Sequence, residues 1–274
     1  MFETTSTEAL QVELSGAVLH VTLNRPDQRN AMSLRMVSEL IDVLSRAESS
    51  GEVRVIVLRG ARGHFCAGAD LKDMAIARMT AMQQRHPPGE LDPIAQVNAQ
   101  FGHLCVAYAK SPIAIVALLE GTVMGGGVGM ACVADVALAS ETAVFRLPET
   151  SLGMVPAQIA PYLVERLGYS QAKRLAVTGG RINAKEAFAL GLVHEVHSQD
   201  QINAALARVL DDILVCAPMA LAATKALLAR ARLTPAAQLV SEAAEVFSRS
   251  AQGPEGLEGI NAFVQKRKPV WAVI

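Results

Sequence analysis

The feature that most constrains this chain is a run of glycines inside its most hydrophobic region. Residues 121–140 read GTVMGGGVGMACVADVALAS, with five glycines in the first nine positions. The apolar stretch SPIAIVALLEG before them predicts a buried strand, and a short helix to Cys132 is expected after them. Because glycine weakens regular structure, this run indicates a close backbone approach or an unusual backbone conformation at a strand-to-helix junction.

The glycines alone allow two interpretations. Residues 121–132 contain no Gly-x-Gly-x-x-Gly register, and no Lys-Ser or Lys-Thr pair follows them, which argues against dinucleotide and phosphate loops. They form either a tight crossing without room for a Cβ, or a helix start whose free N–H groups stabilise negative charge on an oxygen. A second stretch, HFCAGADL at 64–71, has the same order of strand, small residues and helix. Two such loops could donate one N–H each to a single oxyanion.

Composition limits the possible partners. The 274 residues carry a net charge of -1, so no global basic field would attract nucleic acid or an anionic membrane. The four cysteines form no Cys-x-x-Cys pair and predict buried thiols in a reducing compartment. The N-terminus has no basic or apolar leader pattern, no apolar run approaches the ~20 residues of a membrane span, and no set of metal ligands occurs. We therefore predict a cytoplasmic protein without a metal.

Strands and helices alternate through the first two thirds of the chain. A hairpin is expected within residues 10–26 around Ser15-Gly16, and Ser33 is a predicted N-cap of a helix over 34–47. The Pro-rich stretch 85–93 predicts a surface loop or lid. Further strands are expected at VRVIVLRG, DVALAS, AVFRLPET and LVHEVH. The pattern predicts an α/β core over residues 1–200 and a helical region over 201–274.

Six motifs, in order along residues 10–271, resemble the enoyl-CoA hydratase/isomerase (crotonase) superfamily. They are NRPDQRNAMS, HFCAGADLKDM, GTVMGGGVGMACVADVALAS, FRLPETSLGMVPA, ALGLVHEV and INAFVQKRKPVW. The resemblance implies the ClpP/crotonase-like fold of repeated ββα units, with C-terminal helices that assemble a trimer or a dimer of trimers. It also implies acyl-CoA thioester substrates, with coenzyme A as part of the substrate and no separate cofactor.

The resemblance assigns the backbone N–H groups of Ala69 and Gly126 to an oxyanion hole. Arg25 of the first motif is assigned to substrate binding. The remaining assignments are Ala67 near the adenine, Asp70, Leu71 and Lys72 along the CoA, and Phe263 and Lys266 reaching a CoA across a subunit contact.

The resemblance also identifies one catalytic carboxylate and one departure. Hydratases of the superfamily use two glutamates; the first position is Gly129 here, and the second is Glu149, in FRLPET. Among apolar neighbours, Glu149 is expected to have a raised pKa. A single glutamate can activate water for addition at C3, or can move a proton between C2 and C4 without water. Both reactions therefore remain open.

The segment RLPETSLGMVPAQIAPYLVERLG resembles hydratases that act on branched glutaconyl-CoA thioesters such as isohexenylglutaconyl-CoA. This favours hydration of a 3-substituted glutaconyl-CoA over isomerisation. Two other classes of protein have weaker support. A hydrolase would need a nucleophile: Gly-x-Ser-x-Gly is absent, and His64 with Cys66 is a weak candidate pair. A non-catalytic acyl-CoA or RNA binder is disfavoured for RNA because no basic stripe with interleaved aromatics occurs.

Overall fold

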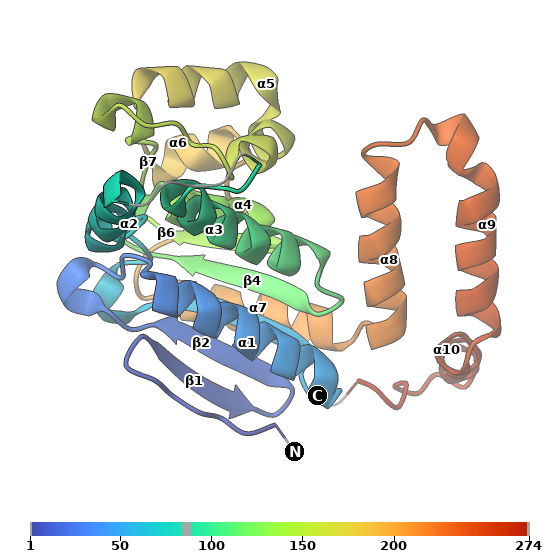
Figure 1. Ribbon diagram of the computed structural model, residues 1–274. Coiled ribbons are helices and arrows are strands. Elements are labelled where there is room, and N and C mark those ends of the chain that lie inside the picture. The colour runs from blue at the N-terminus through green and yellow to red at the C-terminus, as the bar shows by residue number, and fades with distance from the viewer. Residues whose placement is uncertain (1, 84–88, 273–274) are drawn as a thin grey trace.

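The computed structural model, which describes residues 2–83 and 89–272, is built on a six-stranded sheet (Figure 1). The hairpin strands β1 and β2 pair antiparallel, and every following pair is parallel. In spatial order the strands are β1 (Leu10–Ser15), β2 (Val18–Leu23), β3 (Val55–Gly60), β4 (Ala114–Leu119), β6 (Val136–Ser140) and β9 (Glu195–His197). These positions match the predicted strands.

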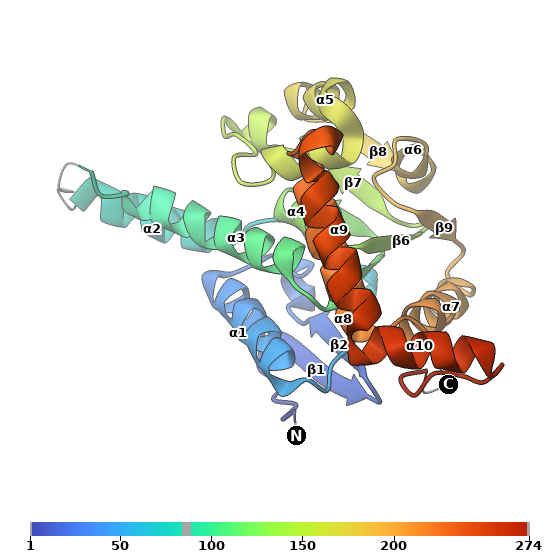
Figure 2. The same cartoon turned by 90° about the vertical axis from the view of Figure 1, so that its right-hand side faces the viewer.

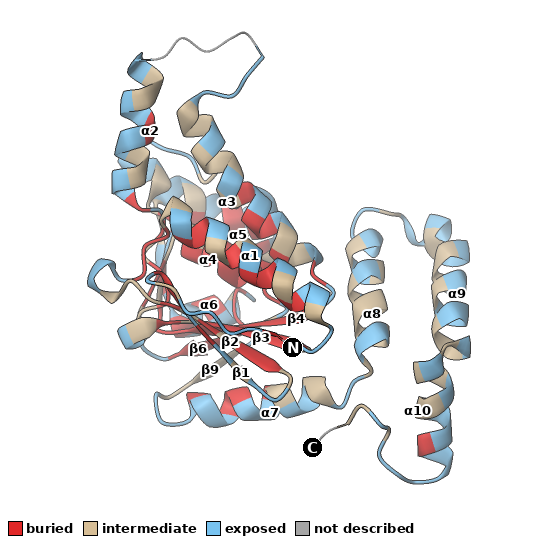
Figure 3. Ribbon diagram, turned by 60° about the horizontal axis from the view of Figure 1, so that its bottom comes forward, coloured by how far each residue is buried: buried red, intermediate tan, exposed pale blue. Residues whose placement is uncertain are grey.

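The central strands read as continuous apolar runs because helices cover both faces of this sheet. Ile56 and Ile115 face one core, which includes apolar residues of α1 (Leu34–Ser50) and α3 (Pro93–Lys110). Their neighbours Val57 and Val116 face a second core against α7 (Ile202–Leu214). Figure 3 shows these strands buried between the helical layers. A parallel sheet covered on both faces gives this pattern.

A second, three-stranded sheet supports the glycine run. Its strands lie in the order β5 (Thr122–Met124), β7 (Val144–Arg146) and β8 (Arg181–Asn183). The sequence did not predict β5 and β8, because three residues are too few to show an alternating pattern. With β5, the chain follows the ββα repeat, as in β1–β2–α1 and β4–β5–α4, where α4 is Gly126–Val133. This repeat is the one that the resemblance to the crotonase superfamily implied.

The helices around the site begin at identifiable caps. Ser33 accepts a hydrogen bond from Met36 N at the start of α1, as predicted, and Asp92 accepts one from Ala95 N at the start of α3. Helix α2 (Leu71–Gln83) runs beside α3, and both project from the core in Figure 2. Of the predicted lid at 85–93, residues 85–88 lie outside the described residues, and 89–92 are exposed.

The remaining helices divide between the core and a separate arm. Helix α5 (Ala160–Thr178) and α6 (Ala184–Ala189) cover the small sheet, whereas α7 packs on the large one. The predicted division at residue 200 falls before α7, whose packing places it with the core. Among the described residues, no single helix has the length and apolar character to span a membrane; α7 and α8 meet that test only as a pair bent by 98°.

Three C-terminal helices form an arm that stands away from the core. They are α8 (Pro218–Ala231), α9 (Ala236–Gln252) and α10 (Pro254–Val264) (Figures 1 and 2). Lys225 of α8 ties the arm to the core by an ion pair with Asp135, at 2.6 Å. Within the arm, only Ala262 is buried, so most of its apolar side chains have no cover in the described chain.

Candidate active site

Two small-residue loops run parallel to each other at the carboxyl ends of β3 and β5. Cys66 N donates to Thr122 O, and Met124 N donates to Cys66 O, both at 2.9 Å, which pairs Cys66 with Val123. Counting three residues on from each partner places Ala69 opposite Gly126. The two loops lie in backbone contact at the intervening glycines, because a Cβ on Gly125 would be 3.7 Å from Gly68 Cα.

The amide of Ala69 is left free by the hydrogen bonds on either side of it. Met32 N donates to Gly68 O at 2.8 Å, and Asp70 N donates to Met32 O at 2.9 Å. Met32 therefore holds both neighbouring peptide units. Within residues 2–83 and 89–272, the Ala69 amide donates to no protein atom. An N–H fixed in this way is positioned to bind an acceptor outside the protein.

The amide of Gly126 is free for a different reason. Gly126 is the first residue of α4, so its N–H has no partner within the helix and lies at the positive end of the helix dipole. The preceding residue, Gly125, has φ +49° and ψ −115°, and donates its own N–H to Arg146 O at 3.0 Å. A left-handed φ of this kind favours glycine. No acceptor for the Gly126 amide occurs among the described residues.

Glu149 lies beside these loops on a short 3₁₀ helix, Glu149–Leu152. Its Oε1 is 2.9 Å from the place a Cβ on Gly125 would occupy. Its Oε2 is buried and has no hydrogen-bond partner in the described chain. Burial raises the pKa of the Glu149 carboxyl. A partly desolvated carboxylate with an unpartnered oxygen is suited to take up and return a proton.

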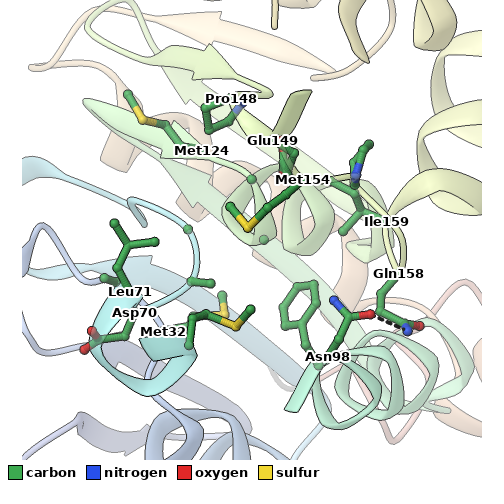
Figure 4. Close-up of a pocket in the computed structure, with 18 of the residues that line it drawn as sticks. Met32, Asp70, Leu71, Asn98, Met124, Pro148, Glu149, Met154, Gln158 and Ile159 are labelled. Carbon is green, nitrogen blue, oxygen red and sulfur yellow. Dashed lines mark hydrogen bonds between the residues drawn. The ribbon is translucent and has the colours of Figure 1, made fainter. Parts of the chain in front are cut away.

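One cavity of about 500 Å³ joins these groups (Figure 4). Most of its lining is apolar, including Met32, Met124, Met154 and Phe101. The backbone of Ala69 and Gly126 and the side chain of Glu149 line the same cavity. Such an apolar pocket with a few convergent polar groups is the usual form of a small-molecule site.

The position of the absent second glutamate has no room for a side chain. A Cβ on Gly129 would lie 2.4 Å from Ile159 Cγ2 and 3.4 Å from Phe101 Cζ. Ile159 and Phe101 thus fill the space with hydrocarbon. Of the two catalytic glutamate positions that the resemblance implies, only Glu149 carries a carboxylate.

The comparisons with known proteins agree with this geometry. The family model described as Enoyl-CoA hydratase/isomerase matches residues 13–273. The chain belongs to the enoyl-CoA hydratase/isomerase family. It is 49% identical to an enoyl-CoA hydratase/isomerase from Marinobacter aquaeolei, with a TM-score of 0.92 over 97% of this chain and 100% of that one.

Two further relatives extend the family comparison. Pseudomonas aeruginosa AtuE is also 49% identical, with a TM-score of 0.90 and coverage of 97% of this chain and 100% of that one. The 2,3-dehydroadipyl-CoA hydratase of Escherichia coli is 30% identical over 253 residues, which cover 92% of this chain and 94% of the relative. The matches span nearly the whole chain, so the family resemblance is not confined to the motifs.

Of the substrate-binding residues predicted for this hydratase/isomerase family member, several line the cavity. Ala67, Ala69, Asp70, Leu71 and Gly126 do so together with Glu149. Lys72 is exposed at the start of α2 and is not part of the lining. Phe263 and Lys266 lie in the C-terminal arm and also do not line it, and Phe263 is 85% exposed. Their predicted role across a subunit contact stays a prediction.

Arg25 has an internal use that the sequence did not reveal. Its guanidinium donates to Asp70 Oδ2 at 2.6 Å and to Ala31 O at 2.7 Å, and it is not part of the cavity lining. Burial raises the pKa of Asp70, but the Lys72 N–H and the Arg25 guanidinium outweigh it, so the pKa is lowered overall. Arg25 therefore supports the loop that carries Ala69.

The alternative nucleophile pair is not formed. Cys66 is fully buried, and burial raises the pKa of its thiol to about 12. His64 Nδ1 accepts a hydrogen bond from Thr122 N at 3.2 Å, which occupies that ring nitrogen. A protonated thiol without a base is not a nucleophile. Among the described residues, no group of three His, Cys, Asp or Glu side chains is placed to hold a metal ion.

Sequence reasoning missed two polar residues of the cavity, Asn98 on α3 and Gln158 before α5. Gln158 Nε2 donates to Asn98 Oδ1 at 2.8 Å. Asn98 carries a weak sequence signal, as a polar residue within PIAQVNAQFGHLCVAYAK, whereas nothing in the sequence links it to Gln158, 60 residues away.

Proposed function

We propose that this chain is a hydro-lyase that adds water across the 2,3 double bond of an enoyl-CoA thioester. One observation carries the proposal. Ala69 and Gly126, whose amides are free, line the same cavity as Glu149, whose buried Oε2 has no hydrogen-bond partner among the described residues. The amides suit a thioester oxygen that becomes negative, and the carboxylate suits the proton transfer that accompanies this change.

The reaction balances with these three groups. Glu149 accepts a proton from water while the water oxygen bonds to C3 of the enoyl group. The electron pair of the double bond moves through C2 onto the thioester oxygen, where the N–H groups of Ala69 and Gly126 stabilise it. The enolate then collapses, and C2 takes the proton back from Glu149. No cofactor besides the coenzyme A of the substrate takes part in the proposed reaction.

The proposed substrate is a branched, 3-substituted glutaconyl-CoA such as isohexenylglutaconyl-CoA. The resemblance of residues 146–168 to hydratases of such thioesters supports it, and the apolar cavity suits a branched hydrocarbon chain. The E. coli relative is named for 2,3-dehydroadipyl-CoA, a thioester that also carries a second carboxyl group.

An enoyl-CoA isomerase is the second candidate, and the packing at Gly129 favours it. Ile159 and Phe101 fill the space where a second carboxylate would stand, and a double-bond shift needs only one proton carrier and no water. Glu149 would then move a proton between C2 and C4, while the same two amides hold the enolate oxygen.

Isotope labelling separates the two reactions. The enzyme is incubated in ¹⁸O-water with a 2-enoyl-CoA and, separately, with a 3-enoyl-CoA. Hydration predicts loss of the conjugated thioester absorbance and ¹⁸O in the product. Isomerisation predicts a gain of absorbance from the 3-enoyl-CoA and no ¹⁸O. The enzyme assignment is wrong if the wild type converts neither thioester and a Glu149→Gln variant binds both as tightly as the wild type does. A non-catalytic acyl-CoA binder then replaces it.

We further propose that the protein works as a homo-oligomer, a trimer or a dimer of trimers. The C-terminal arm exposes large apolar side chains, including Val240 and Phe247 on α9 and Leu257, Ile260 and Phe263 on α10. Exposed apolar surface of this extent supports a partner surface. In such an assembly Phe263 and Lys266 would reach the CoA of another subunit. A cytoplasmic location stays a prediction from the sequence.

A further inference from the structure

Asn98 and Gln158 form a polar pair in a cavity where Asp70, Asp73 and Ser151 are occupied, whereas Glu149 Oε2 and the Arg146 guanidinium have no partner among the described residues. Asp70 is paired with Arg25, Asp73 accepts from Leu34 N, and Ser151 donates to Pro148 O. The Asn98–Gln158 pair, by contrast, is bonded only internally, at 2.8 Å. Both side chains are half-buried and line the cavity, so their spare hydrogen-bonding groups are open to a ligand there.

The direction of the internal bond decides what the pair can bind. Gln158 donates to the oxygen of Asn98, which leaves both N–H groups of Asn98 Nδ2 without an acceptor among the described residues. Figure 4 shows this nitrogen on the side of the amide away from Gln158, toward Met154 and the cavity. Asn98 Nδ2 therefore presents donors without a formal charge, and its complement is an acceptor oxygen.

A glycine inside α3 shows that the fold makes room for this pair. A Cβ on Gly102 would lie 2.2 Å from Gln158 Oε1, so the Gln158 amide packs directly on the helix backbone. A glycine in a helix interior destabilises the helix relative to alanine. Here that cost places the Gln158 side chain beside Asn98, one helical turn away on α3.

The pair and Glu149 lie in different parts of the cavity. Phe101, whose ring approaches the Cβ positions of Gly126 and Gly129 at 3.1 and 3.4 Å, adjoins Asn98 on α3. In Figure 4, Met154 lies between Glu149 and the amide pair, and Asp70 and Leu71 are at the opposite end. An acyl chain with its thioester at Ala69 and Gly126 would reach the Asn98–Gln158 pair with atoms beyond the reacting carbons.

We propose that Asn98 and Gln158 select acyl-CoA thioesters that carry an acceptor oxygen on the acyl chain, a carboxylate in the first instance. This inference rests on the proposed acyl-CoA site and adds the residues that discriminate its substrates. A site that offers hydrogen-bond donors to a ligand oxygen rejects a hydrocarbon of equal shape, because the donors would be left unpaired.

The test measures binding of two saturated thioesters that cannot react. 3-Methylglutaryl-CoA carries the carboxylate, and 3,5-dimethylhexanoyl-CoA replaces it with an isopropyl group of similar shape. Calorimetry on the purified full chain compares wild type with Asn98→Leu, and with Gln100→Leu as a matched control on α3 outside the cavity lining. Asn98→Leu should weaken the binding of 3-methylglutaryl-CoA about 10- to 100-fold. It should change the Kd of 3,5-dimethylhexanoyl-CoA less than about threefold. Gln100→Leu should change neither.

Two further variants keep the inference testable if Asn98→Leu folds poorly. Asn98→Asp has almost the same shape but removes the donors and adds a negative charge, so it should weaken the carboxylate ligand still more. Gly102→Ala displaces Gln158 without changing a cavity side chain and should weaken the same ligand alone. Equal losses for both thioesters, or no loss for either, would overturn the inference.

Failure of the proposed function gives a different result. A wild-type protein that binds both thioesters but converts no enoyl-CoA contradicts the hydratase and isomerase proposals. The measured affinities still decide whether the side-chain amides of Asn98 and Gln158 select the ligand. A wild-type protein that binds neither thioester overturns the acyl-CoA site and this inference together.

Discussion

At the scale of single residues, the site depends on a carboxylate kept in an environment that does not favour its charge. Glu149 Oε2 is buried without a hydrogen-bond partner, and burial raises the pKa of the group. The folded protein therefore binds a proton at a pH where the unfolded chain, with an ordinary value near 4.5, has released it. Stability from this group is present below that value and is lost as the pH rises through the folded pKa.

Replacing Glu149 with Gln should remove both the catalysis and this cost. We expect kcat to fall about 10²–10⁴-fold on any enoyl-CoA substrate, because general acid–base catalysis is lost. At pH 7 the variant should be more stable than wild type, on the order of 1 kcal/mol. Thermal unfolding measured from pH 4 to 8 should show this difference shrinking toward the acid end. A variant that keeps wild-type kcat would exclude Glu149 from the mechanism.

Replacing Gly126 with Val should block the oxyanion site without changing a side chain that carries charge. The new Cβ would lie 3.1 Å from Phe101 Cζ, and the branched side chain would fill the space in front of the amide. Loss of one such donor costs about 10²–10³-fold in kcat. Steady-state kinetics measure the loss of kcat, and a circular dichroism spectrum checks that the variant is folded. A normally folded variant with wild-type turnover would contradict the role of Gly126.

At the scale of elements, the loop that carries Ala69 and the turn that carries Glu149 are positioned by contacts from segments far away in sequence. Asn30, fully buried, donates to Ala61 O and His64 O and accepts from Arg25 N. Arg25 in turn holds Asp70 next to Ala69. The turn that carries Glu149 is fixed separately, by Thr150 Oγ1 donating to Ala176 O at the end of α5. The backbone donor of Ala69 and the carboxylate of Glu149 are thus positioned by different parts of the fold.

Replacing Arg25 with Met should disturb the Ala69 loop and leave a carboxylate at Asp70 without its cation. We expect kcat/KM to fall about 10- to 100-fold, because a small displacement of a catalytic group is costly. Stability should also fall by about 1–3 kcal/mol. The matched control is Arg62→Met, which breaks an exposed ion pair with Asp27 and should change stability by less than about 1 kcal/mol. Equal effects in both variants would contradict a positioning role for Arg25.

At the scale of the whole molecule, the chain consists of a buried α/β core and an arm that has not buried its apolar face. Figure 3 shows the contrast between the sheet and the largely exposed helices α8, α9 and α10. Phe247 is 74% exposed on α9. Apolar surface of this kind is stabilised when another subunit covers it. The core therefore buries its apolar residues within one chain, whereas the arm needs a partner to bury its own.

Replacing Phe247 with Glu should dissociate the proposed oligomer. A charge buried at a subunit contact is costly, whereas the same charge at Ser49, exposed on α1, should leave the assembly intact. Light scattering after size-exclusion chromatography gives the mass of each variant. A wild-type protein that runs as a monomer would contradict the oligomer, and an unchanged oligomer in Phe247→Glu would exclude this part of α9 from the interface.

The sequence by itself determined the α/β class, the apolar strands and the two glycine-containing loops, because periodicity, caps and glycine placement are local properties. The superfamily motifs were enough to single out Glu149 and Gly129. Only the tertiary structure decided that Ala69 and Gly126 lie opposite each other, that Ile159 fills the space at Gly129, that Arg25 binds Asp70 and that Gln158 meets Asn98. These contacts join residues that are 30 to 60 positions apart, and such distances are set by how strands pair and helices pack.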